Sequence, residues 1–237
     1  MIVAIIPARG GSKRIPQKNI RKFCGAPIIK YSIDAARDSG VFDRIIVSTD
    51  CDKIAEVAIN CGAEVPFRRP IELSDDHTPT APVLTHAIQQ LQQSGANLEF
   101  ACGIYPTAPL LQSEHLGEGL RMIKATGAKV VIPVTSFDYP IYRGVGISDA
   151  GALELLWPQR LTTWEQHEVT RSNDLPEAFH DVGQFYWLRV DAFLRDGRLW
   201  GPDTRALVIP RKFVVDIDTP EDWEIAELKR SALYPTA

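Results

Sequence analysis

Four basic side chains follow a short apolar run at the start of the chain, within one loop that also contains Gly10 and Gly11: they are Arg9, Lys13, Arg14 and Lys18. Glycine allows backbone N–H groups to turn toward a ligand without interference from a Cβ atom. Lysine and arginine supply the positive charge that a phosphate chain requires. The loop therefore indicates a binding site for a polyphosphate.

A second interpretation of this loop is a solvated basic turn at the edge of a sheet. The loop contains neither the G-x-x-x-x-G-K-[ST] pattern of a P-loop nor the G-x-G-x-x-G pattern of a dinucleotide-binding turn. However, four cations in a small loop directly after a strand favour the phosphate site over the solvated turn.

Two carboxylates stand close together near the end of the chain, because Asp216 and Asp218 flank Ile217. In an extended segment, side chains at positions i and i+2 project from the same face. Such a pair is costly unless a cation or a proton joins it. Mg²⁺ takes one or two carboxylates and leaves its other positions to water and phosphate. An alternative is that Asp218 merely extends the helix start at Thr219 and Pro220, but that explanation does not cover Asp216.

The basic loop and the acidic pair together predict nucleotide or phosphosugar chemistry with Mg²⁺. In-line attack at phosphorus requires that charge be neutralised on the non-bridging oxygens and on the leaving pyrophosphate. No Ser/His/Asp arrangement competes with this interpretation, since the five histidines are scattered along the chain. Only His180, which stands next to Asp181 before an aromatic strand, stays a candidate for a catalytic histidine.

The composition is that of an ordinary globular protein. The chain has 237 residues, 45% of them hydrophobic and 24% charged, which predicts a single domain over 1–237. A net charge of −4 gives no basis for binding nucleic acid or an anionic membrane surface, and no apolar run is long enough to cross a bilayer. The four cysteines lack metal-ligand spacing, so we expect reduced thiols and a cytoplasmic location.

Apolar runs alternate with amphipathic segments along most of the chain. Strands are expected at 2–6, 44–48, 63–65, 100–105, 130–134, 183–190, 206–209 and 214–218. Helices are expected at 26–40, 52–60, 81–93, 114–126 and 220–231. This alternation predicts an α/β fold with a doubly wound, mostly parallel sheet. Ligands of such sheets bind beyond the carboxyl ends of the strands, so we expect the segments 9–19, 49–50 and 105–109 on one rim.

The alternation breaks between 136 and 181, where glycines gather and residues 162–174 are polar with few apolar anchors. One interpretation is an extended hairpin followed by a mobile loop. The other, which we favour, is an inserted arm that packs on a second subunit, because an insert of this size rarely buries itself.

The sequence IIPARGGSKRIPQKN at 5–19 resembles the signature of the nonulosonic-acid cytidylyltransferases, the CMP-sialic acid synthetase family. The resemblance continues through VSTD at 47–50, RPIELS at 69–74, PTAP at 106–109 and DIDTPEDW at 216–223. It implies a Rossmann-like nucleotidyltransferase fold. The implied reaction transfers CMP from CTP to the anomeric hydroxyl of a nine-carbon sugar acid and releases pyrophosphate.

The resemblance also implies roles for individual residues. CTP is expected to contact Ala8, Arg9, Gly10, Gly11, Ser12, Lys13, Asn19, Arg69, Thr78 and Thr80. The residues expected to act at the reacting phosphate are Arg9, Lys13, Lys18 and Asp218. Mg²⁺ is expected on Asp216 and Asp218. The insert at 136–181 corresponds to the dimerisation region of the family, which implies a homodimer.

The chain departs from the family pattern on the sugar side. Members that act on sialic acid typically read QPTSP where this chain has Tyr105 followed by PTAP. The residues expected beside the sugar are Tyr105, Arg143, Gln184, Phe185 and Tyr186, with Trp187 in the same aromatic wall. These departures resemble the branch that acts on pseudaminic acid, whose di-acylated 9-deoxy sugar suits a less polar wall.

Other functions stay open at this point. The same chemistry could activate N-acetylneuraminic acid or legionaminic acid. A catalytically silent nucleotide-binding protein that regulates a partner is a different class, but the complete set of cations and carboxylates argues against it. The Kdo branch of the family has an Asp in a QGDEP motif where this chain has Thr107, so Kdo is disfavoured.

Overall fold

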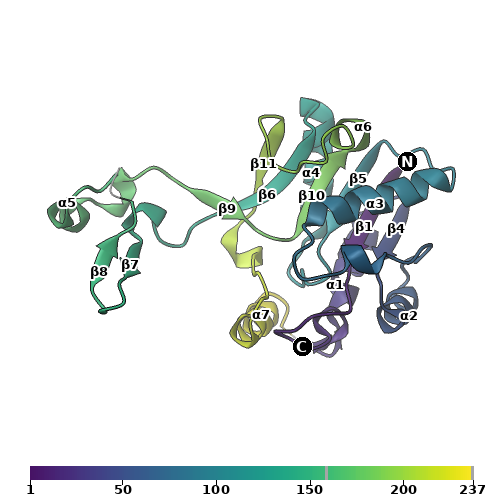
Figure 1. Cartoon of the computed structure of the whole chain (residues 1–237), viewed down its shortest axis with the longest axis horizontal. Coiled ribbons are helices and arrows are strands. Elements are labelled where there is room, and N and C mark those ends of the chain that lie inside the picture. The colour runs from purple at the N-terminus through teal and green to yellow at the C-terminus, as the bar shows by residue number, and fades with distance from the viewer. Residues whose placement is uncertain (158–159, 236–237) are drawn as a thin grey trace.

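A seven-stranded sheet forms the centre of the molecule (Figure 1). The computed structural model describes residues 1–157 and 160–235. The sheet order is β11-β6-β10-β5-β1-β4, with β9 paired to β6. The strands are β1 (Ile2–Pro7), β4 (Arg44–Ser48), β5 (Phe100–Ile104), β6 (Val130–Ser136), β9 (Phe179–Asp181), β10 (Phe185–Arg189) and β11 (Thr204–Val208). Apart from β9 and β10, they run parallel, which confirms the predicted α/β fold.

Helices cover both faces of this sheet, as a doubly wound arrangement requires. One face packs against α1 (Ile28–Asp38), α2 (Asp52–Asn60) and α4 (Ser113–Thr126). The other face packs against α3 (Thr80–Gln93) and the short α6 (Val190–Phe193). The central strand β1 divides its side chains between the two faces, since Ala4 and Ile6 join the first core and Val3 and Ile5 the second. Because β1 is buried on both faces, its sequence is apolar throughout and does not alternate with polar residues.

The last helix, α7 (Pro220–Leu233), packs on a small third core beside the basic loop. Trp223 and Ala226 contact Phe23 and Ile15 there, together with Ile217. The helix begins with a capping box, in which the side chain of Thr219 accepts from the N–H of Asp222 and Asp222 accepts from the N–H of Thr219. The predicted helix start is thus confirmed.

Two of the predicted strands differ in the structure. Residues 214–218 form no strand, although the segment was expected to join the sheet; it crosses from the end of the sheet to α7. The expected strand at 63–65 is reduced to one isolated bridge between Glu64 and Ile46. Strand β10 is antiparallel to both of its neighbours, because the chain returns to the sheet through the inserted segment rather than through a crossover helix.

The inserted segment extends away from the sheet as an arm (Figure 1). It contains a hairpin of β7 (Val145–Ile147) and β8 (Leu153–Leu155), followed by the short helix α5 (Trp164–Val169). A second small hairpin, of β2 (Lys22–Phe23) and β3 (Ala26–Pro27), follows the basic loop. Short 3₁₀ turns occupy Lys18–Ile20, Ile71–Leu73, Ile141–Arg143, Ser172–Asp174 and Arg211–Phe213. Within the described residues, no helix has the length and apolar character needed to span a membrane.

Candidate active site

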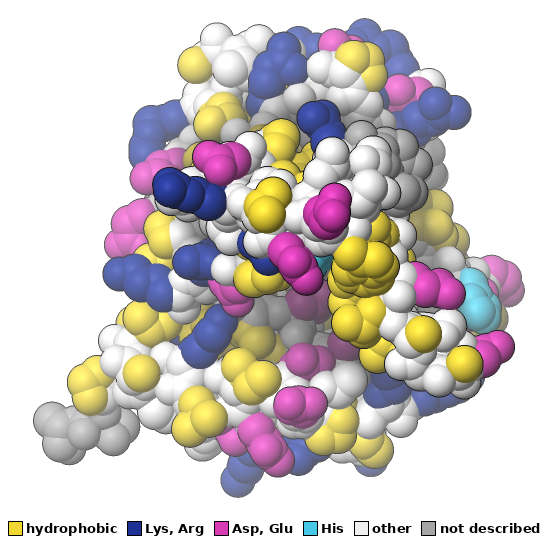
Figure 2. Space-filling view, turned by 90° about the vertical axis from the view of Figure 1, so that its left-hand side faces the viewer, with side chains coloured by type: hydrophobic (Ala, Val, Ile, Leu, Met, Phe, Trp, Pro, Cys, Tyr) yellow, Lys and Arg dark blue, Asp and Glu magenta, His cyan; other side chains and the backbone are white. Residues whose placement is uncertain are grey.

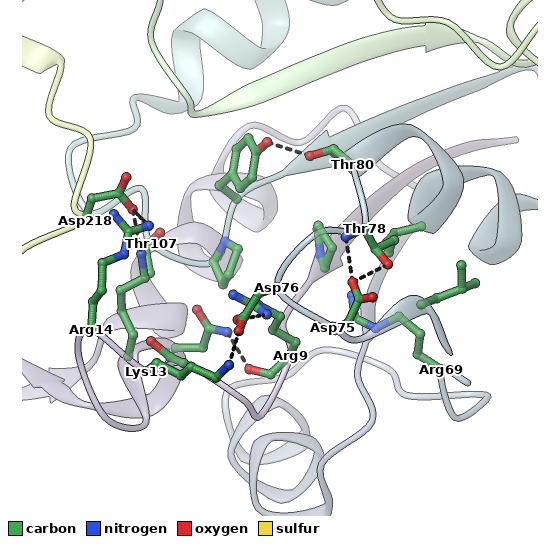
Figure 3. Close-up of a pocket in the computed structure, with 18 residues that line it drawn as sticks. Arg9, Lys13, Arg14, Arg69, Asp75, Asp76, Thr78, Thr80, Thr107 and Asp218 are labelled. Atoms are coloured by element: carbon green, nitrogen blue, oxygen red, sulfur yellow. Dashed lines mark hydrogen bonds and ion pairs between the residues drawn. The ribbon is translucent and has the colours of Figure 1, made fainter. Parts of the chain in front are cut away.

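The basic loop lines a cavity of about 420 Å³, here called the main cavity, at the carboxyl ends of β1 and β5. Its wall is formed by Pro7, Arg9, Ser12, Lys13, Arg14, Lys18, Asn19, Arg69, Leu73, Asp75, Asp76, Thr78, Thr80, Val83, Tyr105, Pro106, Thr107 and Asp218 (Figure 3). The volume lies within the range of small-ligand sites. The prediction that the basic loop and the 105–109 segment share one rim is confirmed.

Local hydrogen bonds hold the basic loop in a tight turn. The side-chain amide of Asn19, which is buried, donates to the carbonyl oxygen of Arg9 at 2.9 Å. Gln17 has a φ of 54°, in the left-handed region that non-glycine residues rarely adopt. The loop therefore folds back on itself, so that cations from both of its ends face the same cavity.

Asp76 pairs with two of these cations. One carboxylate oxygen lies 2.5 Å from Nη1 of Arg9 and the other lies 2.5 Å from Nζ of Lys13 (Figure 3). Hydrogen bonds from Lys13 and Arg9 lower the pKa of Asp76 to about 2. Asp76 was not among the predicted site residues. It forms ion pairs with Arg9 and Lys13, the two cations that were expected to bind phosphate.

Three of the expected contacts to CTP fall elsewhere or differ in kind. Ala8 is fully buried and does not line the main cavity. The backbone N–H of Gly10 donates to Asp50 at 3.0 Å instead of pointing to a ligand, and an added Cβ at Gly10 would meet Cys51 at 3.0 Å. Gly10 is thus needed for close packing on the segment after β4. Gly11 is exposed, with open space around it.

Arg69 and the threonines form the opposite wall of the main cavity. The guanidinium of Arg69 is buried, 3.5 Å from a carboxylate oxygen of Asp50, and its Nε donates to Ser74. One of its terminal nitrogens, Nη2, is buried without a hydrogen-bond partner among the described residues, and burial lowers the pKa of Arg69. Thr78 donates through its N–H and its hydroxyl to Asp75, each at 2.6 Å.

The acidic pair faces a smaller cavity of about 340 Å³, here called the acidic cavity. Its wall is formed by Lys18, Tyr105, Thr107, Asp181, Gly183, Tyr186, Asp216 and Asp218. Ile217 is fully buried between the two carboxylates, so the prediction that both carboxylates face one side is confirmed even though the segment is not a strand. Four residues line both cavities, which makes the two cavities neighbours: Lys18, Tyr105, Thr107 and Asp218.

Asp218 and Asp216 differ in their partners. One oxygen of Asp218 lies 3.0 Å from Arg14 and 3.5 Å from Lys18. In the described part of the chain, no ion pair or hydrogen bond reaches the carboxylate of Asp216. Desolvation, followed by the neighbouring charge of Asp218, raises the pKa of Asp216. Its side chain is exposed by surface area, but it faces a cavity whose walls remove part of its hydration.

The carboxylates of Asp216 and Asp218 suit an ion such as Mg²⁺, which keeps water and phosphate ligands, better than an ion that is ligated entirely by side chains. The described residues contain no cluster of three or more His, Cys, Asp or Glu side chains that could hold an ion. Two carboxylates on one side, one of them unpaired and desolvated, would leave the remaining positions of a hard cation to water and phosphate oxygens. Asp216 and Asp218 would hold such an ion at the boundary of the two cavities.

Tyr105 lies where the cavities meet. Its hydroxyl is 2.6 Å from the hydroxyl of Thr80, and its ring contacts Tyr186 edge-on, with centroids 5.7 Å apart. Both tyrosines line the acidic cavity. They also line a third, more open cavity of about 530 Å³, whose wall includes Pro79, Leu199 and Trp200.

Four of the expected sugar residues do not reach these cavities. Phe185 and Trp187 are fully buried in the core beside α4, because side chains alternate along β10 and only Tyr186 faces the other side. Gln184 is buried and donates to the carbonyl oxygen of Phe213. Arg143 lies in the arm, where it donates to the carbonyl oxygen of Thr170. Contact of these four side chains with the sugar therefore stays a prediction that the three cavities do not support.

Two carboxylates outside the predicted set of site residues also line the cavities. Asp76 lies in a polar loop, and only its position shortly after Arg69 in the sequence could have indicated that it belongs to the site. Asp181 borders the acidic cavity because β10 is antiparallel, which brings the start of that strand beside the end of β5. His180, the neighbour of Asp181, packs against Phe137 with the two rings tilted by 57°, and it lines none of the three cavities.

A doubly wound sheet with a basic loop and a carboxylate pair at one rim is the arrangement of a nucleotidyltransferase. The chain belongs to the cytidylyltransferase family, whose model matches residues 3–189.

Within this family, the chain is similar to enzymes that are named for particular sugar acids. The chain is 39% identical to the pseudaminic acid cytidylyltransferase of Campylobacter jejuni, over 95% of this chain and 94% of that protein. It is 30% identical to the CMP-N,N'-diacetyllegionaminic acid synthase of Legionella pneumophila, with the same coverage of 95% and 94%. Among solved structures, CMP:2-keto-3-deoxy-manno-octonic acid synthetase complexed with CTP matches with a TM-score of 0.72, at 14% identity, over 98% of this chain and 99% of that chain. The last likeness concerns the fold alone.

Proposed function

We propose that this enzyme transfers CMP from CTP to the anomeric hydroxyl of a nonulosonic acid and releases pyrophosphate. The observation that carries the proposal is the meeting of cations and carboxylates at Lys18, which lines both cavities together with Asp218. A site with cations on one side and a carboxylate pair on the other suits attack at the α-phosphorus of a nucleoside triphosphate.

The basic loop would bind the triphosphate. Arg9, Ser12 and Lys13 line the main cavity at the end of β1, where CTP would replace Asp76 as their anionic partner. Arg69, Thr78 and Thr80 line the same cavity on the side of α3 and its preceding loop, and would contact the nucleoside. Nη2 of Arg69 supports this role, because it is buried and makes no hydrogen bond among the described residues, and only the carboxylate of Asp50, 3.5 Å away, faces it until a ligand supplies an acceptor.

Lys18 would stabilise charge at the reacting phosphate, because it stands between the main cavity and the acidic pair. Mg²⁺, held by Asp216 and Asp218, would neutralise charge on the phosphate oxygens. The anomeric hydroxyl would approach from the acidic cavity, opposite the leaving pyrophosphate on the basic loop.

Pseudaminic acid is the sugar we propose. The identity to the Campylobacter jejuni enzyme over nearly the whole chain supports it. The aromatic residues Tyr105 and Tyr186 support it as well, since together with Leu199 and Trp200 they give the third cavity a less polar wall. N-acetylneuraminic acid and legionaminic acid are the alternative substrates, since relatives named for each of these sugars match nearly the whole chain.

We further propose that the protein is a cytoplasmic homodimer joined through the arm at 136–181. Of the 16 exposed large hydrophobic residues among those described, eight lie in this segment: Tyr139, Ile147, Leu153, Leu156, Trp157, Trp164, Val169 and Phe179. Figure 2 views the molecule from the side of the arm, where hydrophobic side chains are exposed among charged ones. A partner subunit would cover them. The four free cysteines accord with a reducing compartment.

Pyrophosphate release tests the proposal. CTP and Mg²⁺ would be incubated with pseudaminic, N-acetylneuraminic and legionaminic acids in parallel, with a chelator as control. The highest kcat/KM is expected with pseudaminic acid. Absence of turnover with all three sugars would exclude the enzymatic proposal, whereas a preference for N-acetylneuraminic acid would contradict only the choice of sugar.

A further inference from the structure

Asp181 is held in one orientation by two hydrogen bonds. One carboxylate oxygen accepts from the N–H of Gly183 at 2.9 Å, and the other accepts from the hydroxyl of Tyr186 at 2.5 Å. Gly183 has a φ of 61°, which allows the turn between β9 and β10 that brings these groups together. The backbone turn and the hydroxyl of Tyr186 therefore orient the carboxylate of Asp181 without a ligand.

The carboxylate fixes the direction of the hydrogen bond. An ionised carboxylate only accepts hydrogen bonds, so the hydroxyl of Tyr186 must donate its single hydrogen to Asp181. Burial raises the pKa of Tyr186, and the phenol keeps its hydrogen at neutral pH. The hydroxyl oxygen of Tyr186 can then only accept a further hydrogen bond.

Both groups face the cavity that contains the acidic pair. Asp181, Tyr186 and Gly183 form one wall, and Asp216 and Asp218 form another. The Tyr105 hydroxyl, which lies nearby, is 2.6 Å from the hydroxyl of Thr80, and either of these two groups can be the donor. The side chains of Asp181 and Tyr186 can therefore offer only acceptor capacity on their side of the cavity. Within the described residues, neither of them makes a hydrogen bond or an ion pair with the cations that face the main cavity, so phosphate binding does not account for this wall.

We propose that Asp181 is a specificity-determining residue, which together with Tyr186 reads an N–H or O–H donor of the acceptor sugar and so positions the sugar beside the acidic pair. This inference rests on the proposed function. It predicts that the site favours sugars with a hydroxyl or acylamino N–H at this point. It rejects sugars that present a carbonyl or a carboxylate there, because two acceptors would face each other.

Asp181→Asn tests the proposal, because it keeps the size of the side chain and converts one acceptor into a donor. The KM for the sugar is expected to rise about 10- to 100-fold, as for a lost hydrogen bond to a charged group. The dissociation constant of CTP should stay within about twofold. The matched control is Asp191→Asn, an exposed carboxylate just beyond β10 that lines none of the three cavities; it should leave both values unchanged.

The double variant Asp181→Asn/Tyr186→Phe separates positioning from packing. If the two residues act as one unit, the double variant should raise the sugar KM hardly more than Asp181→Asn alone. Sugar analogues that lack single donors extend the test, since one of them should bind wild type weakly and lose little further in Asp181→Asn.

An unchanged sugar KM in Asp181→Asn would overturn the inference, provided that wild type turns over the sugar. If Asp181→Asn does not fold, Tyr186→Phe decides the matter, since an unchanged sugar KM in that variant is equally fatal. No turnover by wild type with any nonulosonic acid would instead defeat the proposed function, so the two failures are distinguishable.

Discussion

Lys18 joins the two halves of the site. Its ammonium donates a hydrogen bond to the carbonyl oxygen of Ile217 at 2.5 Å and lies 3.5 Å from a carboxylate oxygen of Asp218. These partners are 199 and 200 positions away in the sequence. The contact therefore fixes the acidic pair relative to the basic loop, and places one positive charge at the boundary of the two cavities.

Replacing Lys18 should impair chemistry more than binding. Lys18→Met keeps much of the apolar stem but removes the charge, so kcat is expected to fall about 100-fold or more, as when one stabilising donor is removed from a transition state. The dissociation constant of CTP should change much less, because Arg9 and Lys13 remain. Steady-state kinetics and calorimetry with CTP measure the two effects. Lys22→Met, at an exposed lysine just beyond the same loop, is the control. Equal losses in kcat and in CTP affinity would assign Lys18 to binding alone.

Asp216 gives a prediction about pH. Its pKa is raised in the folded protein by desolvation and by Asp218, so the folded state binds its proton more tightly than the unfolded state does. This proton contributes stability below the ordinary pKa of the carboxyl, and the contribution is lost as the pH rises through the raised value. At neutral pH without metal, Asp216→Asn should therefore raise Tm, by about 2–4 °C for each kcal/mol gained.

Thermal melts with and without Mg²⁺ check this prediction. Wild type should be stabilised by Mg²⁺ with CTP, and Asp216→Asn should lose most of that added stabilisation. Acidification should weaken Mg²⁺ binding at a higher pH than an ordinary aspartate would require, because a proton competes for the same oxygen. A lower Tm of metal-free Asp216→Asn at neutral pH would contradict the account.

Asp76 competes with the phosphate chain for Arg9 and Lys13. Asp76→Asn removes the competing charge, so CTP should bind several-fold more tightly at low ionic strength, and the difference should shrink in high salt. Titration calorimetry at two salt concentrations measures it. Asp52→Asn removes another exposed ion pair, the one with Arg68, and serves as the control. Weaker CTP binding in Asp76→Asn would instead mean that Asp76 contributes to the bound state.

The arm should govern the oligomeric state. Ile147→Glu combined with Val169→Glu places two charges on side chains that are 75% and 77% exposed, where a partner subunit is proposed to pack. Wild type should sediment as a dimer of the 26.4 kDa chain, and this variant as a monomer. Ile59→Glu, at a 56% exposed residue on α2, should stay dimeric. A monomeric wild type at micromolar concentration would rule out the arm as a stable interface.

The rim of the sheet could be predicted from the sequence because strand alternation determines it. Once 2–6 and 100–105 are taken as parallel strands, the basic loop and Tyr105 must follow them at the same edge. Asp216 and Asp218 were also placed correctly on one side, since an extended backbone alternates whether or not it joins a ladder. Ile217 between them is buried as that alternation requires.

The sugar side could not be predicted in the same way. Strand β10 is buried on both faces, so its sequence does not reveal whether Phe185 or Tyr186 faces the cavity; the pairing with β5 decides it. Asp181 and Asp76 stand in turns whose positions depend on contacts far along the chain. The antiparallel direction of β10 depends on how the arm returns to the sheet, which no local pattern specifies.

Identification of the reaction product tests whether the anomeric hydroxyl attacks the α-phosphorus of CTP. Pseudaminic acid carrying ¹⁸O at the anomeric hydroxyl would be incubated with CTP, Mg²⁺ and the enzyme, and the products analysed by ³¹P NMR and mass spectrometry. The expected product is a CMP-sugar that keeps the label in the bridge between the sugar and phosphorus, with one pyrophosphate per CMP-sugar. Hydrolysis of CTP to free CMP, or a CMP-sugar without the label, would contradict attack by the anomeric hydroxyl on the α-phosphorus.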